Sequence, residues 1–97
     1  MSYSNQTTTT KSASEGYQII LKTLPEQGFT ISRRRDLANL AQGTKEVNGV
    51  TRTFNVSCQL GKETKVNVAC MSDGDPSEAE IAAVDGLLEA LKTAMSA

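Results

Sequence analysis

Three adjacent arginines, Arg33, Arg34 and Arg35, form the densest cluster of charged side chains in the sequence. A guanidinium is always charged and presents a planar fork of donors, which suits phosphates and carboxylates. Neighbouring side chains on a strand point to opposite faces, so at least one of the three faces away from solvent or meets a partner. The cluster therefore predicts either a solvated basic patch or a site for phosphate or an acidic subunit.

A second set of polar side chains alternates with apolar ones along two predicted strands. Amides and hydroxyls can read the edges of RNA bases, and a lysine can neutralise a phosphate. No aromatic side chain accompanies them, which argues against a surface on which bases stack. The set is either an ordinary solvated sheet face or an RNA-binding surface. Its candidate contact residues are Asn55, Ser57, Gln59, Lys65 and Asn67. The arginine cluster, Arg33, Arg34 and Arg35, is assigned to the same RNA-binding site.

The side chains that most enzymes need are missing or isolated. The sequence has no histidine, which is the commonest general base and the commonest metal ligand. Cys58 and Cys70 lack metal-ligand spacing, and we interpret them as small core residues. Four acidic side chains on a predicted helix are expected to be solvated: Glu78, Glu80, Asp85 and Glu89. We therefore expect no enzyme, metal, cofactor or small-molecule substrate.

Size and charge predict a homo-oligomer, either a dimer or a larger assembly. A chain of 97 residues buries only about two thirds of its unfolded surface, so a partner subunit would stabilise it. Residues 1–65 carry nine Lys and Arg against five Asp and Glu, whereas residues 66–97 carry one against six. This asymmetry favours contacts between subunits, and it leaves the basic half available to an anionic ligand such as RNA.

No apolar run is long enough to cross a membrane, and no signal peptide is visible at the start. We therefore expect a cytoplasmic protein, or one assembled into a virion inside a cell. The sequence predicts neither secretion nor membrane insertion.

Two alternating segments, residues 51–60 and 65–72, predict a β-hairpin with its turn at residues 61–64. Apolar side chains occupy every second position of both strands, which gives the hairpin one apolar face. The predicted cross-strand pairs are Leu60 with Val66, Cys58 with Val68, and Val56 with Cys70.

Residues 76–94 predict an amphipathic helix. Asp75 supplies the N-cap, Pro76 takes the first helical position, and Glu78 follows three residues after the cap. The apolar stripe is expected to pack on the sheet, on a partner subunit, or on both. Its residues assigned to a dimer interface are Ile81, Val84, Leu87, Leu88 and Leu91.

The first half of the chain is less regular. Residues 1–12 are rich in Ser, Thr, Asn and Gln, and they predict a flexible polar arm or an edge strand ordered only on assembly. A single α+β domain follows at residues 13–97. Residues 13–24 fit either a helix or one arm of a hairpin, and both interpretations stay open. The remaining expectations are a strand at residues 28–34, a short helical turn at 36–42 and a loop at 45–50.

The order of these features carries a family resemblance. A basic strand ends in Ser32-Arg33-Arg34-Arg35-Asp36, a polar-apolar alternation and a Lys-Val-Asn-Val strand follow, and Asp-Pro-Ser-Glu-Ala-Glu opens a leucine-rich helix. Over residues 17–94 this order resembles the coat proteins of single-stranded RNA bacteriophages. The resemblance implies an antiparallel sheet that binds RNA on its polar face and C-terminal helices that interlock two chains.

Two functions follow as hypotheses. The first is a non-enzymatic, coat-like assembly protein that forms dimers through its sheet and helix and holds RNA. The alternative is a small monomeric adaptor or regulator that binds another protein through its basic strand or helix stripe.

Overall fold

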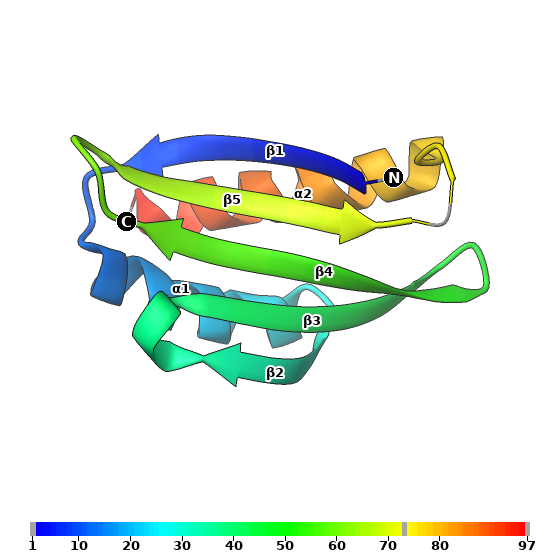
Figure 1. Cartoon of the computed structure of the whole chain (residues 1–97), viewed down its shortest axis with the longest axis horizontal. Coiled ribbons are helices and arrows are strands. Elements are labelled where there is room, and N and C mark those ends of the chain that lie inside the picture. The colour runs from blue at the N-terminus through cyan, green and yellow to red at the C-terminus, as the bar shows by residue number, and fades with distance from the viewer. Residues whose placement is uncertain (1, 73, 97) are drawn as a thin grey trace.

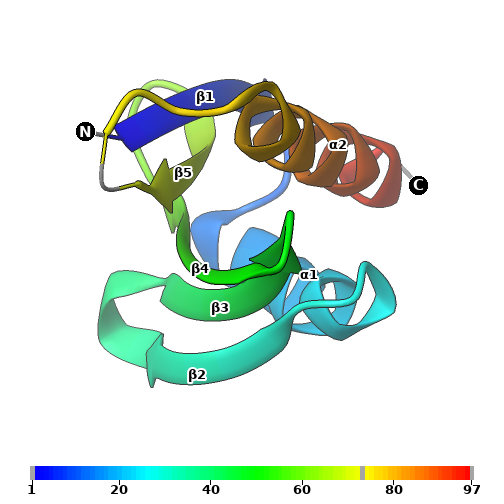
Figure 2. The same cartoon turned by 90° about the vertical axis from the view of Figure 1, so that its right-hand side faces the viewer.

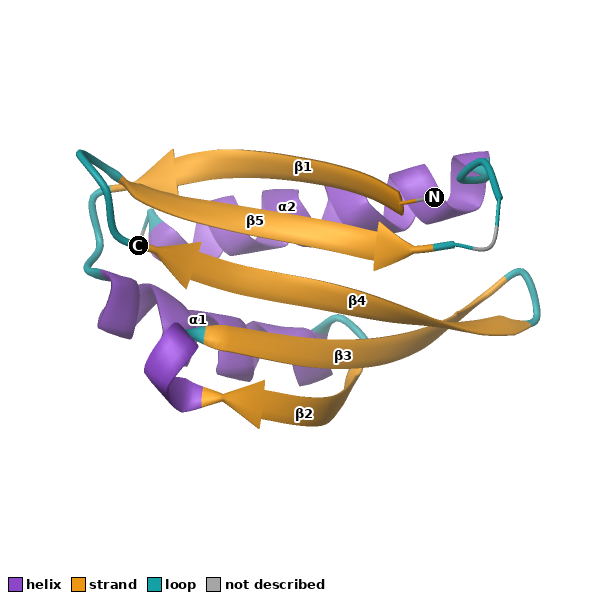
Figure 3. Ribbon diagram, in the orientation of Figure 1, coloured by secondary structure: helices purple, strands orange, loops and turns teal. Residues whose placement is uncertain are grey.

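Five strands form one antiparallel sheet, and two helices pack on one of its faces (Figures 1 and 3). This computed structural model describes residues 2–72 and 74–96. Met1 of the predicted arm, Asp73, and Ala97 at the end of the predicted domain lie outside the described residues. The elements in chain order are β1 (Ser2–Thr9), α1 (Ala13–Glu26), β2 (Thr30–Arg35), the 3-10 turn η1 (Asp36–Ala38), β3 (Leu40–Val47), β4 (Val50–Gln59), β5 (Thr64–Met71) and α2 (Glu78–Met95). The strands lie in the order β1-β5-β4-β3-β2.

The sheet is strongly curved, and both helices lie on its concave side (Figure 2). Helix α2 packs behind β1 and β5, and α1 packs behind the other half of the sheet (Figure 1). In the described part of the chain, no helix covers the opposite, outer face. The α+β class, the antiparallel sheet and a C-terminal helix packed on it are therefore confirmed.

The core lies between the sheet and the helices, and aliphatic side chains dominate it. Cys58 and Cys70 belong to this core as free thiols, with exposed fractions of 0% and 1%, as the sequence indicated. Burial raises the pKa of both thiols, which keeps them protonated and unreactive. The largest fully buried side chains are Phe54, Ile20, Leu24, Leu87, Leu91, Val56, Val66, Val68 and Val84.

Strands β4 and β5 are antiparallel neighbours, but their register differs from the prediction by two residues. Cys58 pairs with Val66, and Val56 pairs with Val68. Because β4 ends at Gln59, Leu60 falls in the connection and is 79% exposed instead of joining the core. A shift of two residues leaves every side chain on the same face of the sheet. The apolar side chains therefore lie on one face as predicted, although the predicted register is wrong.

The predicted loop at residues 45–50 is wrong, because β3 and β4 run through it. Val47 pairs with Val50, which leaves only Asn48 and Gly49 as the turn. Their φ angles are 52° and 81°, and an Asn-Gly pair suits a two-residue hairpin turn because both positions require positive φ. The Asn-Gly pair therefore indicates a hairpin rather than the loop expected from the sequence.

The N-terminal segments are both ordered. Residues 13–24 belong to helix α1, which Ser12 and Glu15 open with a capping box. Of the two alternatives for the N-terminal segment, residues 2–9 form the edge strand rather than a flexible arm, because they pair along their whole length with β5 of the same chain. Backbone pairing to a central strand fixes it despite its polar composition.

Helix α2 begins two residues later than predicted, with Ser77 rather than Asp75 as its N-cap. The Ser77 hydroxyl accepts from the Glu80 amide at 3.1 Å, and the Glu80 carboxylate accepts from the Ser77 amide at 2.8 Å. Glu80 was expected to be solvated, but it is 4% exposed and lies 3.0 Å from the Arg52 guanidinium. This buried ion pair favours the later of two overlapping capping boxes.

The apolar stripe of α2 packs on the sheet of its own chain. This position corrects the prediction of a dimer interface, because fully packed side chains present no surface to a partner. Ile81 is half-buried, whereas the other four predicted interface residues are at most 4% exposed. These four residues are Val84, Leu87, Leu88 and Leu91.

Candidate ligand-binding groove

The residues of β4 and β5 that were predicted to contact RNA lie together on the outer face of the sheet. Ser57 lies directly opposite Asn67, and Gln59 lies opposite Lys65. Asn55 precedes them on the same face of β4. Ser57 is only 5% exposed, so its neighbours rather than bulk solvent surround it. This polar surface has no helix over it in the described part of the chain.

The arginine cluster divides between the two faces of β2. A bulge between Ile31 and Arg33 shifts the register, so Arg33 lies opposite Gln42 on the outer face and Arg35 lies opposite Leu40. Arg34 lies opposite Ala41, a core residue, and therefore points to the helix side. The structure thus places two arginines on the outer face and removes the third from it.

Arg34 completes a small polar network at the edge of the core. The Tyr17 hydroxyl donates to Asp36 Oδ1 at 2.6 Å, and Arg34 Nε lies 3.2 Å from the same oxygen. The hydrogen bond from Tyr17, aided by Arg34, holds the pKa of Asp36 below its ordinary value despite some desolvation. Desolvation and this carboxylate raise the pKa of Tyr17. The network links α1, β2 and η1, and it engages the Arg34 side chain in contacts within the chain.

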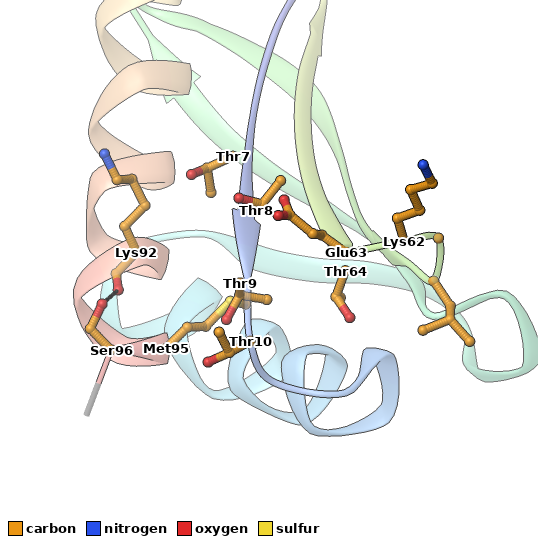
Figure 4. Close-up of a pocket in the computed structure, with 12 residues that line it drawn as sticks. Thr7, Thr8, Thr9, Thr10, Lys62, Glu63, Thr64, Lys92, Met95 and Ser96 are labelled. Carbon is orange, nitrogen blue, oxygen red and sulfur yellow. Dashed lines mark hydrogen bonds between the residues drawn. The ribbon is translucent and has the colours of Figure 1, made fainter.

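A concave site lies elsewhere, at the end of the sheet where β1 finishes (Figure 4). It is a groove of about 550 Å³, and we call it the threonine groove. Three segments that are distant in the sequence form it: the end of β1, the connection from β4 to β5, and the last turn of α2. Its lining residues are Thr7, Thr8, Thr9, Thr10, Leu60, Gly61, Lys62, Glu63, Thr64, Lys92, Met95 and Ser96.

Each segment places its side chains for a clear structural reason. Thr7 and Thr9 lie opposite Val66 and Thr64, so both face the helix side of the sheet. Figure 4 shows the threonines between the end of α2 and the β4–β5 connection. The Ser96 hydroxyl donates to the Lys92 carbonyl at 2.7 Å and so closes the helix beside them.

The lining combines hydroxyls, apolar groups and charges. Met95 is 4% exposed and forms part of the buried wall, while Leu60 exposes an apolar side chain at the rim. Lys62 and Lys92 bring two ammonium groups, and Glu63 brings one carboxylate. Lys92 Nζ lies 3.2 Å from Glu89, an exposed ion pair that a ligand could replace at small cost. Such a surface can bind a ligand that has an apolar body and an anionic head group.

None of the lining residues was a predicted site residue. Their proximity depends on the fold, because they come from both ends and the middle of the chain. Two local signals were present: the uninterrupted run of threonines at residues 7–10, and a leucine followed by glycine in a turn. Within residues 2–72 and 74–96, no three or more Cys, Asp or Glu side chains gather as a metal site. No helix in these ranges has the length and apolar character of a membrane span.

Comparison with known proteins bears on the fold. No family model and no curated protein matches the chain. Among solved structures, it is similar to the crystal structure of Ara h 8.0201, a Bet v 1-like protein, with a TM-score of 0.57 and 11% identity. The match covers 100% of this chain and 99% of that one. The chain shares this fold. At such low identity, the likeness carries no ligand or partner from one protein to the other.

This likeness overturns the predicted resemblance to phage coat proteins and, with it, the capsid, virion and RNA-binding functions. The physical reason lies on the apolar face of the sheet. The resemblance implied C-terminal helices that interlock two chains, but α1 and α2 of the same chain cover the apolar face (Figure 2). Residues 13–24 also form a helix where the coat family begins with strands.

Proposed function

We propose that this protein binds a small amphipathic organic anion in the threonine groove without transforming it. The single observation that carries the proposal is the groove itself, a concavity of about 550 Å³ between the sheet and the end of α2. Concave sites with some apolar wall and a few convergent polar groups are the usual places for small ligands.

The chemistry of the lining supports this ligand class. The exposed side chain of Leu60 favours a hydrocarbon or aromatic body, because covering it removes apolar surface from water. The threonine hydroxyls can donate to or accept from the polar atoms of a ligand. Lys62 and Lys92 each offer an ammonium group, and an anionic head could take the place of Glu89 in its exposed ion pair with Lys92.

The lining also supports binding rather than catalysis. The hydroxyl of Thr9 accepts from the Lys11 amide at 3.2 Å, and the hydroxyl of Ser96 donates to a carbonyl. Neither contact activates a hydroxyl as a nucleophile, because that would require a neighbouring base. The groove contains hydroxyl and ammonium groups suited to fixing a ligand in place.

Binding of 8-anilinonaphthalene-1-sulfonate, an amphipathic anion, tests the proposal by fluorescence titration. We expect saturable one-to-one binding, and we expect Lys92→Ala to weaken it by about two- to five-fold, as for loss of one exposed ion pair. Lys22→Ala removes an exposed lysine from α1 and is the matched control, which should leave the dissociation constant unchanged. Equal affinities for both variants and the wild-type protein would refute an anion site beside Lys92.

A second candidate is an adaptor that binds an acidic protein surface through the outer face of the sheet. Arg33 and Arg35 are both exposed on that uncovered face, and they favour this function specifically. A titration with a glutamate-rich peptide distinguishes the candidates. Amide shifts confined to β2 and β3 would favour the adaptor, and an absence of shifts there would count against it.

A further inference from the structure

We propose that two copies of this chain pair through the free edges of their β1 strands, antiparallel and across a twofold axis. The pairing would join two five-stranded sheets into one continuous sheet. This inference goes beyond the proposed function and does not depend on a bound ligand, because it uses the free backbone groups along the β1 edge. The last residues of β1, Thr7 to Thr9, and Lys92 also line the threonine groove, so the two surfaces share these residues.

The two edges of the sheet differ in how well they are protected. Edge strands usually carry charges, prolines or bulges, because their unpaired backbone groups otherwise pair with another chain. β2 (Thr30–Arg35) has three arginines and a bulge, and it spans only six residues. β1 (Ser2–Thr9) spans eight residues and contains no charged residue and no proline. It also pairs with β5 in unbroken register, without a bulge. The β1 edge is therefore the unprotected one.

The helix side already holds β1 in the geometry that pairing needs. Asp85 on α2 accepts from the Tyr3 hydroxyl at 2.9 Å and from the Asn5 side-chain amide at 3.1 Å. The bond to Asp85 raises the pKa of the Tyr3 hydroxyl above its ordinary value. A strand ordered in advance loses less conformational entropy on association. β1 therefore already has the extended conformation that pairing with another strand requires.

A second copy fits this edge because the strand can pair with itself. Opposed residues in an antiparallel pair share a face, and the even-numbered residues of β1 face outward. A twofold pairing therefore places either Asn5 opposite Asn5 or Gln6 opposite Gln6. A charged strand would bring like charges together across this axis, whereas every pair of β1 with itself joins neutral side chains.

The charges on α2 complement each other in the same arrangement. α2 lies behind β1 and runs in the same direction (Figure 1). Two antiparallel β1 strands would therefore carry two antiparallel α2 helices. Glu78, in the acidic first turn of one helix, would then lie toward Lys92, in the last turn of the other. Opposite charges favour this docking over a parallel one.

Size-exclusion chromatography with light scattering tests the pairing. The wild-type chain should have twice its protomer mass of 10.4 kDa. The double variant Ser4→Lys/Gln6→Lys should halve that mass, because either register puts lysine opposite lysine. Thr30→Lys/Ser32→Lys adds the same charge to the other edge and should leave the dimer intact. A monomeric wild-type protein, or a dimeric Ser4→Lys/Gln6→Lys variant, would overturn the proposal.

Charge exchange separates loss of pairing from loss of folding. Ser4→Glu/Gln6→Glu should also be monomeric, yet mixing it with the lysine variant should restore the dimer mass, because lysine then meets glutamate in either register. Failure of the mixed sample to dimerise, with both variants folded by circular dichroism, would contradict the edge as the interface. In the dimer, disulfide formation by Asn5→Cys or by Gln6→Cys identifies the register, because directly opposed residues lie within disulfide reach.

Discussion

Gly16 has a packing role that its neighbours in α1 do not share. A Cβ added at Gly16 would overlap Cys58 Sγ on β4 and approach Met95 Cε at 3.7 Å. We expect Gly16→Ala to lower the free energy of unfolding by about 1–2 kcal/mol, because overpacking outweighs the better helix propensity of alanine. Urea unfolding followed by circular dichroism measures the change.

Gly86 supplies the matched control for this variant. A Cβ at Gly86 meets nothing within 4 Å, so Gly86→Ala should raise the free energy of unfolding by about 0.5–1 kcal/mol. Cys58→Ala removes the sulfur atom with which the Cβ added at Gly16 collides. The double variant Gly16→Ala/Cys58→Ala should therefore lose less stability than the sum of its single variants, and strict additivity would contradict the assigned contact.

The Arg52–Glu80 pair is the buried charge interaction of the described core. The Glu80 side chain is 5% exposed and that of Arg52 is 22% exposed. Arg52→Met should cost about 2–3 kcal/mol of stability, because it leaves the buried carboxylate without this partner. Adding Glu80→Gln to Arg52→Met should recover part of that loss. A double-mutant cycle from urea unfolding measures the coupling, and zero coupling would show that the pair contributes nothing.

At the scale of elements, Asp36 links the first helix to the edge strand β2 through Tyr17 and Arg34. Because the folded pKa of Asp36 is lowered, its contribution to stability exists above the ordinary pKa and disappears as pH falls through the lowered value. Asp36→Asn should therefore destabilise the protein at about pH 7 and have little effect at about pH 2. Glu46→Gln on the outer face controls for the loss of one negative charge. An Asp36→Asn effect that does not vary with pH would rule out this linkage.

The elements themselves were predictable to different degrees. The leucine stripe of α2 and the alternation in β4 and β5 are local periodicities, so both could be found from the sequence. Their ends were less certain, because two capping boxes overlap at residues 75–80 and only burial of Glu80 against Arg52 separates them. Helix and hairpin patterns coincide at residues 13–24, where packing on the sheet determines the outcome.

At the scale of the whole molecule, prediction from sequence failed for reasons of topology. The polar face of the sheet suggested RNA, yet antiparallel sheets commonly leave one polar face to water. No local sequence pattern indicates whether the chain's own helix or a partner's helix covers the apolar face. The threonine groove is likewise invisible along the chain, because Thr9, Leu60 and Met95 meet only after folding.

The most direct test of the central claim is a map of ligand contacts in solution. Titration of the labelled protein with 8-anilinonaphthalene-1-sulfonate, followed by amide and methyl NMR shifts, reports the site residue by residue. We predict saturable shifts gathered at residues 7–10, 60–64 and 92–96, with little change at Arg33 and Arg35. Shifts gathered on the outer face of the sheet, or an absence of saturable shifts in the three segments, would contradict a ligand site in the threonine groove.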